Sequence, residues 1–144
     1  MYTLLSSASF DSAHFLKGYN GKCSNIHGHR WKVEITVASN QLEKEGQTRG
    51  MVVDFGTLKE DINAIVDELD HCLIIETGSL KEKTLEALDD EGFKVVCMDF
   101  RPTAENFAKY FYEEMEERGY NVLLSKVFET PKNCAGYSKG ADDE

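Results

Sequence analysis

Two stretches near the start of the chain alternate apolar and polar residues, which is the pattern of half-buried β-strands. One covers residues 2–14 and the other residues 29–38, where Trp31 and Val33 share one face. The residues between them, 16–26, hold two glycines and two asparagines. That composition is typical of a loop, so we expect two strands joined by a loop.

Three later stretches place apolar residues at the spacing of one helix face. They cover residues 57–69, 79–92 and 102–119, and the stripe over 79–92 is thin. The first two begin with the Ser/Thr-x-x-Glu pattern of a capping box, so we expect helix starts at Thr57 and Ser79. A proline at the entrance and a glycine at the exit mark the third helix.

The remaining segments complete an α+β pattern. Residues 93–100 form a short strand, residues 121–138 form two strands around a turn at Pro131, and residues 139–144 form an acidic tail. There is no repeat and no linker. The order of elements predicts one domain over residues 1–138, in which an antiparallel sheet carries helices packed on one face.

The bulk properties exclude several classes of function. A chain of 144 residues suits one domain with a core, and its net charge of -10 argues against binding nucleic acid or an anionic membrane through a general electrostatic field. A local positive pocket could still take an anionic small substrate. No apolar run approaches the length that spans a bilayer, and the first residues lack the features of a signal peptide. The four cysteines are widely spaced without a CxxC pair, so we expect free thiols and a cytoplasmic protein.

Three histidines carry the most visible chemistry. His27 and His29 are two residues apart, so a strand that begins near His27 places both imidazoles on one face. In an antiparallel pair the end of the first strand lies beside the start of the second, which brings His14 next to them. Three histidines with an open fourth position form the ligand set of a catalytic zinc site. The alternative is loop and core histidines without a joint role.

Cys23 stands four residues before His27. A thiol in that place is either a fourth zinc ligand, which would close the site as a structural one, or a base whose pKa falls beside the cation. The sequence leaves both possibilities open. Cys72, Cys97 and Cys134 are expected to pack as small hydrophobic residues.

Two acidic positions complete the candidate site. Asp70 precedes His71 at the end of a helix, where a carboxylate can fix the tautomer of an imidazole and form an acid–base dyad. A chance dipeptide is the alternative. Glu129 lies just before the Pro131 turn on the face of Val127, so its carboxylate either has a partner or faces water at a sheet edge.

Six blocks in order along nearly the whole chain resemble the family of 6-pyruvoyl-tetrahydropterin synthases and 6-carboxy-tetrahydropterin synthases. They are FDSAH ending at His14, CSNIHGH, GMVVDFGTLK, LDH, PTAEN and ETPKNCAGY. The resemblance implies a tunnelling fold (T-fold), in which a four-stranded antiparallel sheet carries two helices. It also implies a homohexamer built as a dimer of trimers, with active sites at the subunit interfaces.

The resemblance also implies a role for each candidate residue. The residues that match the zinc ligands are His14, His27 and His29. The residues that match the catalytic base and the acid–base relay are Cys23, Asp70 and His71. Glu129 matches the carboxylate that anchors the pterin ring, and the residues that help to bind the ring are Thr103 and Glu105.

The implied substrate is 7,8-dihydroneopterin triphosphate, from which triphosphate is eliminated. The three-residue gap between Cys23 and His27 resembles the bacterial 6-carboxy branch, which releases acetaldehyde and serves 7-deazapurine (queuosine) synthesis. The 6-pyruvoyl synthases usually have a longer gap, and a 6-pyruvoyl product is the alternative. The lysines that could meet the triphosphate, by position alone, are Lys17, Lys22 and Lys132. The chain departs from a minimal member in its longer insert around residues 77–92.

Two other classes of protein fit parts of the pattern. A cupin would use His27, His29 and Glu34 in its first motif. Glu34, however, falls on the opposite strand face, the second cupin motif is missing, and two strong amphipathic helices disagree with a pure barrel. A non-catalytic zinc protein would use Cys23 as its fourth ligand and would lose the metal only on unfolding.

Overall fold

The structure is a computed structural model in which residues 1–140 are described. Its elements, in chain order, are β1 (Tyr2–His14), β2 (His27–Ser39), α1 (Phe55–Asp67), β3 (Cys72–Glu76), α2 (Glu82–Asp90), β4 (Val95–Met98), α3 (Ala104–Glu117), β5 (Val122–Thr130) and β6 (Asn133–Tyr137). The predicted acidic tail over residues 139–144 lies largely outside the described residues.

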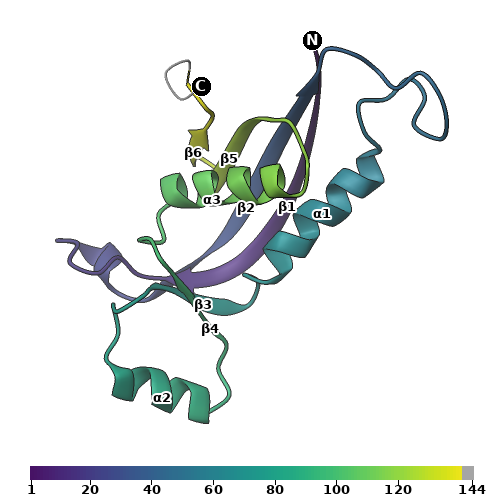
Figure 1. The fold of residues 1–144 in the computed structure, drawn as a ribbon. Coiled ribbons are helices and arrows are strands. Elements are labelled where there is room, and N and C mark those ends of the chain that lie inside the picture. The colour runs from purple at the N-terminus through teal and green to yellow at the C-terminus, as the bar shows by residue number, and fades with distance from the viewer. Residues whose placement is uncertain (141–144) are drawn as a thin grey trace.

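A curved six-stranded sheet with the order β4-β3-β1-β2-β5-β6 runs through the molecule (Figure 1). Its strands β1, β2, β5 and β6 are antiparallel neighbours and match the four antiparallel strands that the resemblance implies. Strands β3 and β4 extend the sheet beyond β1 by parallel pairing. Strand β4 lies within the strand predicted over residues 93–100, whereas β3 was not predicted. The predicted α+β class is confirmed, but the prediction of a purely antiparallel four-stranded sheet is wrong by these two parallel strands.

The core fills the space between the sheet and two helices, α1 and α3, which cover the same face (Figure 1). Trp31 of β2 is fully buried, stacks on Phe10 of β1 at 6.0 Å between ring centroids, and meets Phe107 of α3 edge-on at 5.0 Å. Burying a side chain of this size stabilises the fold by about 1.5–3 kcal/mol. The Trp31 ring also lies 4.9 Å from that of His14 and 5.3 Å from that of His29, so the core directly supports the candidate site.

Two helix starts differ from the prediction. Asp54 caps α1 by accepting hydrogen bonds from two amides of the first turn, one of them that of Thr57, so Thr57 lies inside the helix. An aspartate is both a strong N-cap and a favourable charge at the positive end of the helix dipole. Helix α2 begins after Lys81 without a side-chain cap, because the Ser79 hydroxyl donates to the carbonyl of Glu76 instead.

Helix α2 belongs to the insert that the sequence places around residues 77–92. It buries no residue and stands away from the rest of the molecule at the end of β3 and β4 (Figure 1). None of the helices in the described part of the chain is long and apolar enough to cross a membrane.

Candidate active site

The structure brings the three histidines together where β1 ends and β2 begins. His14 pairs directly with His27 across the two strands, and His29 follows two residues later on the same face. The ring centroids are 4.5 Å apart for His14 and His27, 5.1 Å for His14 and His29, and 4.9 Å for His27 and His29. Strand alternation and register therefore suffice to assemble the cluster.

Backbone carbonyls orient two of the imidazoles. Nδ1 of His14 lies 2.8 Å from the carbonyl oxygen of Pro102, and Nδ1 of His27 lies 2.7 Å from that of Asn25. A neutral imidazole that donates from Nδ1 leaves a lone pair on Nε2, which is the arrangement of a metal ligand. Within residues 1–140, the Nε2 atoms of all three histidines are buried; those of His14 and His27 have no hydrogen-bond partner, and that of His29 faces a carboxylate described below. These orphaned nitrogens fit a bound metal ion.

Burial keeps the cluster in the form that binds metal. Burial, with smaller contributions from the neighbouring His27 and His29, lowers the pKa of His14 to about 4, although the hydrogen bond to the carbonyl of Pro102 opposes the shift. Burial also lowers the pKa of His29, against the opposing charge of Glu129. His14 and His29 are therefore neutral imidazoles at neutral pH, with a lone pair available.

Glu129 of β5 joins the histidines. Its Oε1 lies 2.9 Å from Nε2 of His29, and the four ligand atoms of this group, which we call the His₃Glu cluster (His14, His27, His29, Glu129), all lie within 4.8 Å of one another. Such a set of three nitrogens and one carboxylate oxygen could hold a metal ion. The sequence leaves open whether the carboxylate of Glu129 has a partner or faces water. In the structure it has a partner, His29.

Cys23 lies in a 3₁₀ turn (Lys22–Ser24) before β2 and is half-buried. Its carbonyl accepts a hydrogen bond from the amide of Leu16, and its sulfur does not belong to the His₃Glu cluster. Arg101 contacts the same loop, since its Nη2 donates to the carbonyl of Lys17 and its guanidinium carbon lies over the ring of Tyr19, 5.8 Å from the centroid.

The other cysteines follow the prediction only in part. All four thiols are free, as expected. Cys72 is buried, and burial raises the pKa of its thiol. Cys97 and Cys134 are exposed, so the expectation that they pack in the interior is wrong within this chain, because they lie on short outer strands of the sheet.

Asp70 and His71 form an ordered pair at the end of α1. Nδ1 of His71 lies 2.9 Å from Oδ2 of Asp70, and His71 adopts a positive φ of 54° that non-glycine residues rarely use. The main chain of Asp11 in β1 holds both residues, because its amide donates to Oδ1 of Asp70 and its carbonyl accepts from the amide of His71. The Asp11 amide, and then His71, hold the pKa of Asp70 below its usual range, so the carboxylate stays ionised at neutral pH.

Two further residues of this region were missed by sequence reasoning. Arg30 forms two hydrogen bonds with the carboxylate of Asp11, at 2.9 and 3.0 Å, and the two residues are direct partners across β1 and β2. Opposite charges facing each other on paired strands are the signal that could have found them. The main chain of Asp11 also holds Asp70 and His71 by hydrogen bonds, so the ion pair of Arg30 with Asp11 helps to fix the position of these two residues.

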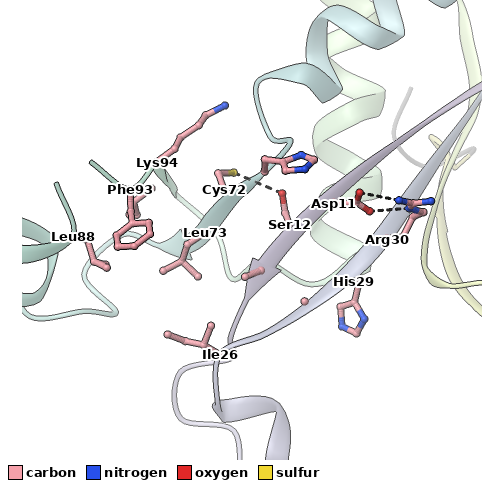
Figure 2. A pocket seen from close by; sticks show the side chains of 14 residues that line it. Asp11, Ser12, Ile26, His29, Arg30, Cys72, Leu73, Leu88, Phe93 and Lys94 are labelled. Carbon is pink, nitrogen blue, oxygen red and sulfur yellow. Dashed lines mark hydrogen bonds and ion pairs between the residues drawn. The ribbon is translucent and has the colours of Figure 1, made fainter. Parts of the chain in front are cut away.

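The largest hollow at the site has a volume of about 760 Å³ and includes His29, Arg30 and His71 in its lining. The insert forms one of its walls. Figure 2 shows Leu88 of the insert and Phe93, which directly follows the insert, on one side of the hollow, with Ile26 across from them. The extra residues of this chain therefore border the candidate site.

Glu129 lies between two smaller hollows. One, of about 530 Å³, is lined by His29 and Lys32 among others, and one of about 350 Å³ is lined by Glu105 and Asn133. Glu105 is thus close to Glu129 at one hollow. Thr103 instead caps α3, because its hydroxyl accepts a hydrogen bond from the amide of Asn106.

The cations at the hollows are not those suggested by position in the sequence. Arg30 and Lys94 line the largest hollow, and Lys32 lines the second. Lys17, Lys22 and Lys132 line none of these three hollows.

Sequence comparison connects this geometry to known proteins. The model of the family described as 6-pyruvoyl tetrahydropterin synthase matches residues 3–140. A protein of Haemophilus influenzae named 6-carboxy-5,6,7,8-tetrahydropterin synthase is 30% identical over 142 residues, which cover 96% of this chain and 100% of that protein. A protein of Rickettsia bellii with the same name is 39% identical over 131 residues, covering 87% and 91%. The resemblance found in the six sequence blocks is thereby confirmed.

Solved structures share the fold. The 6-pyruvoyl tetrahydropterin synthase of Caenorhabditis elegans superposes with a TM-score of 0.67 at 25% identity, covering 96% of each chain. An uncharacterized protein from Wolinella succinogenes superposes with a TM-score of 0.80 at 23% identity, covering 96% of this chain and 98% of the other.

Proposed function

This chain belongs to the 6-pyruvoyl tetrahydropterin synthase family, and we propose that it is a zinc-dependent lyase, a 6-carboxy-5,6,7,8-tetrahydropterin synthase. It converts 7,8-dihydroneopterin triphosphate and one water into 6-carboxytetrahydropterin, acetaldehyde and triphosphate, in the synthesis of 7-deazapurines such as queuosine. The names of the Haemophilus and Rickettsia relatives support this choice of product.

The observation that carries the proposal is the convergence of three buried Nε2 atoms, on His14, His27 and His29, whose only partner is the carboxylate of Glu129 beside His29. Neutral imidazoles with their Nδ1 atoms held by carbonyls are the usual nitrogen ligands of zinc. Bound there, zinc supplies Lewis-acid chemistry that acidifies the side-chain hydroxyls of the substrate and the adjacent C–H.

Cys23 and the Asp70–His71 pair move the protons. The Cys23 thiolate removes a proton from the substrate side chain as a general base. His71 returns protons to carbon or to leaving oxygens through its Nε2, because Asp70 holds its Nδ1 at 2.9 Å. The imidazole of His71 is 79% exposed within one chain, which suits a residue that completes a site at a subunit interface. We therefore include the homohexamer with interfacial sites in the proposal.

Binding of the substrate falls to a second group of residues. Glu129 pairs with the amino group and a ring N–H of the pterin in two parallel hydrogen bonds, with Thr103 and Glu105 nearby. The triphosphate binds to cationic side chains at the hollows, although the chain as a whole is negatively charged. Arg30 and Lys94 line the hollow that also contains His71. A local positive group can bind an anion on an acidic protein.

A 6-pyruvoyl product remains the second candidate, because the metal site, the base and the pterin anchor serve both reactions. The three residues between Cys23 and His27 favour the 6-carboxy reaction. A different spacing changes where the thiol stands relative to the side-chain carbons of the substrate, and so which bond is broken after triphosphate leaves.

The product decides between the two reactions. We expect anaerobic incubation with 7,8-dihydroneopterin triphosphate to give 6-carboxytetrahydropterin by mass analysis and one equivalent of acetaldehyde in an aldehyde trap. A tetrahydropterin that keeps its three-carbon side chain, with no trapped acetaldehyde, would reverse the choice in favour of the pyruvoyl reaction. No turnover of this substrate by the zinc-loaded protein would contradict both.

A further inference from the structure

The loop between β1 and β2, residues 15–26, carries Cys23 and leads directly into His27. Within this loop, the amide of Leu16 donates to the carbonyl of Cys23 at 2.9 Å, and Cys23 itself lies in the 3₁₀ turn Lys22–Ser24. Loops are in general more mobile than the strands that they connect. A general base must lie within hydrogen-bond reach of the proton that it removes, so the position of this loop matters for the proposed reaction.

Arg101 contacts this loop from the segment that precedes α3. Its Nη2 donates to the carbonyl of Lys17 at 3.2 Å, and its guanidinium carbon lies over the ring of Tyr19, 5.8 Å from the centroid. Its Nε is buried and has no hydrogen-bond partner within residues 1–140. A guanidinium is attracted to the face of an aromatic ring, and more strongly where water is excluded. The side chain of Arg101 therefore ties the loop to the start of α3.

Gly21 allows the ring of Tyr19 to lie against the turn that contains Cys23. A Cβ atom at position 21 would lie 2.8 Å from Cε1 of Tyr19, so any larger residue would displace the ring. The amide of Gly21 donates to the carbonyl of Tyr19 at 3.2 Å. The carbonyl of Gly21 accepts from the amide and the hydroxyl of Ser24, at 3.2 and 2.8 Å. Contacts thus run from Arg101 through Tyr19 and Gly21 to the turn.

The same segment also orients a histidine of the candidate site. The carbonyl oxygen of Pro102 lies 2.8 Å from Nδ1 of His14. The carbonyl of Arg101 accepts from the amide of Thr103 and from the side-chain amide of Asn106, at 2.8 and 2.9 Å, which fixes the segment to the first turn of α3. Two consecutive residues therefore hold His14 by a main-chain group and the loop between β1 and β2 by a side chain.

We propose that Arg101 is a positioning residue, whose side chain fixes the loop that carries Cys23 relative to His14. It thereby sets where the thiol stands at the candidate site. The hold on the loop rests on the contacts above, whereas its effect on turnover rests on the proposed function. Arg101 lies outside the His₃Glu cluster, so its removal should leave the metal in place while the base moves.

Amide hydrogen exchange measures the hold on the loop independently of the reaction. In the zinc-loaded protein, we expect Arg101→Gln to speed the exchange of amides in residues 16–24 by about threefold or more, because the loop opens more often. Tyr19→Leu should have the same effect, and Tyr19 is 48% exposed, so the fold does not depend on its ring. The matched control is Arg118→Gln, which removes a guanidinium from the other end of α3, where it pairs with Asp61 at 3.6 Å. Its loop should exchange at the wild-type rate.

Kinetics test the effect on catalysis. We expect Arg101→Gln to keep one zinc per chain and to lose about 10- to 100-fold in kcat, since displacing a reacting group by about 1 Å can cost about 100-fold. KM should stay within about twofold of wild type, because the groups that bind the substrate do not move. Arg101→Lys, which can keep a cation over Tyr19, should recover part of kcat and slow the exchange of the loop again.

The wild-type rate of loop exchange in Arg101→Gln would overturn the inference, and so would faster exchange with an unchanged kcat. A higher KM with unchanged exchange would overturn it in favour of a role for Arg101 in substrate binding. Absence of turnover in the wild-type protein would contradict the proposed function, while the exchange rates would still decide whether Arg101 holds the loop.

Discussion

Replacing His27 with alanine is expected to remove both the metal and the activity. His27 supplies a buried Nε2 atom that has no hydrogen-bond partner, and the loss of one of the three imidazoles leaves too few strong ligands to hold zinc. We expect zinc affinity to fall by more than the about 10- to 100-fold that follows removal of a supporting hydrogen bond. His27 is only half-buried, so this variant disturbs the core less than a change at His14. Metal content after dialysis against a mild chelator, with turnover of the same sample, measures the effect.

His71→Ala is the matched control for the loss of an imidazole. His71 is the one histidine of the chain outside the His₃Glu cluster, and it contacts Asp70 instead. We expect this variant to keep one zinc per chain while its turnover falls. Full metal content and activity in His27→Ala would exclude the three-histidine site, and zinc loss in His71→Ala would show that the metal lies elsewhere.

Cys23→Ala is expected to keep its zinc and lose most of its turnover, by about 10²- to 10⁴-fold, which is the usual contribution of a general base. The physical reason is the position of Cys23, half-buried on the loop before β2 with a sulfur outside the His₃Glu cluster. The comparison with Cys97→Ala, which changes an exposed thiol on β4, controls for nonspecific effects of removing a cysteine. Zinc loss in Cys23→Ala, with zinc retained in Cys97→Ala, would instead make Cys23 a metal ligand.

The same variants test whether one active site takes its residues from one chain or from two. If Cys23 and His71 of one site come from different chains, oligomers assembled from a mixture of Cys23→Ala and His71→Ala chains contain some sites with both wild-type residues. Such a mixture should regain measurable turnover, although each variant alone is nearly inactive. A mixed oligomer with no more activity than its parents would place both residues of a site in the same chain.

The histidine cluster was the part of the candidate site that could be predicted best from the sequence. Its assembly depends on local rules only, namely strand alternation and the pairing of consecutive antiparallel strands, and these place His14 beside His27. The contact between Glu129 and His29 depends instead on a register shift between β5 and β6, which no residue pattern in the sequence predicts.

The missed strand β3 shows a different limit. Its sequence, Cys72–Glu76, is a short apolar run directly after a helix, and buried parallel strands lack the alternation that marks a half-exposed strand. The strand pairs with the end of β1, about sixty positions earlier in the chain. A reader of the sequence who does not recognise β3 cannot predict that the insert lies beside the candidate site. In the structure, Leu88 and Phe93 line the largest hollow of that site.

In the proposed function, this chain is a pterin synthase whose chemistry depends on one metal ion held by His14, His27 and His29. The most direct test is to strip the wild-type protein of metal and to titrate zinc back while following turnover of 7,8-dihydroneopterin triphosphate. We predict negligible activity without metal, a linear rise with added zinc, and a plateau at one zinc per chain. Full activity of the metal-free protein, or a plateau at a different stoichiometry, would contradict the account.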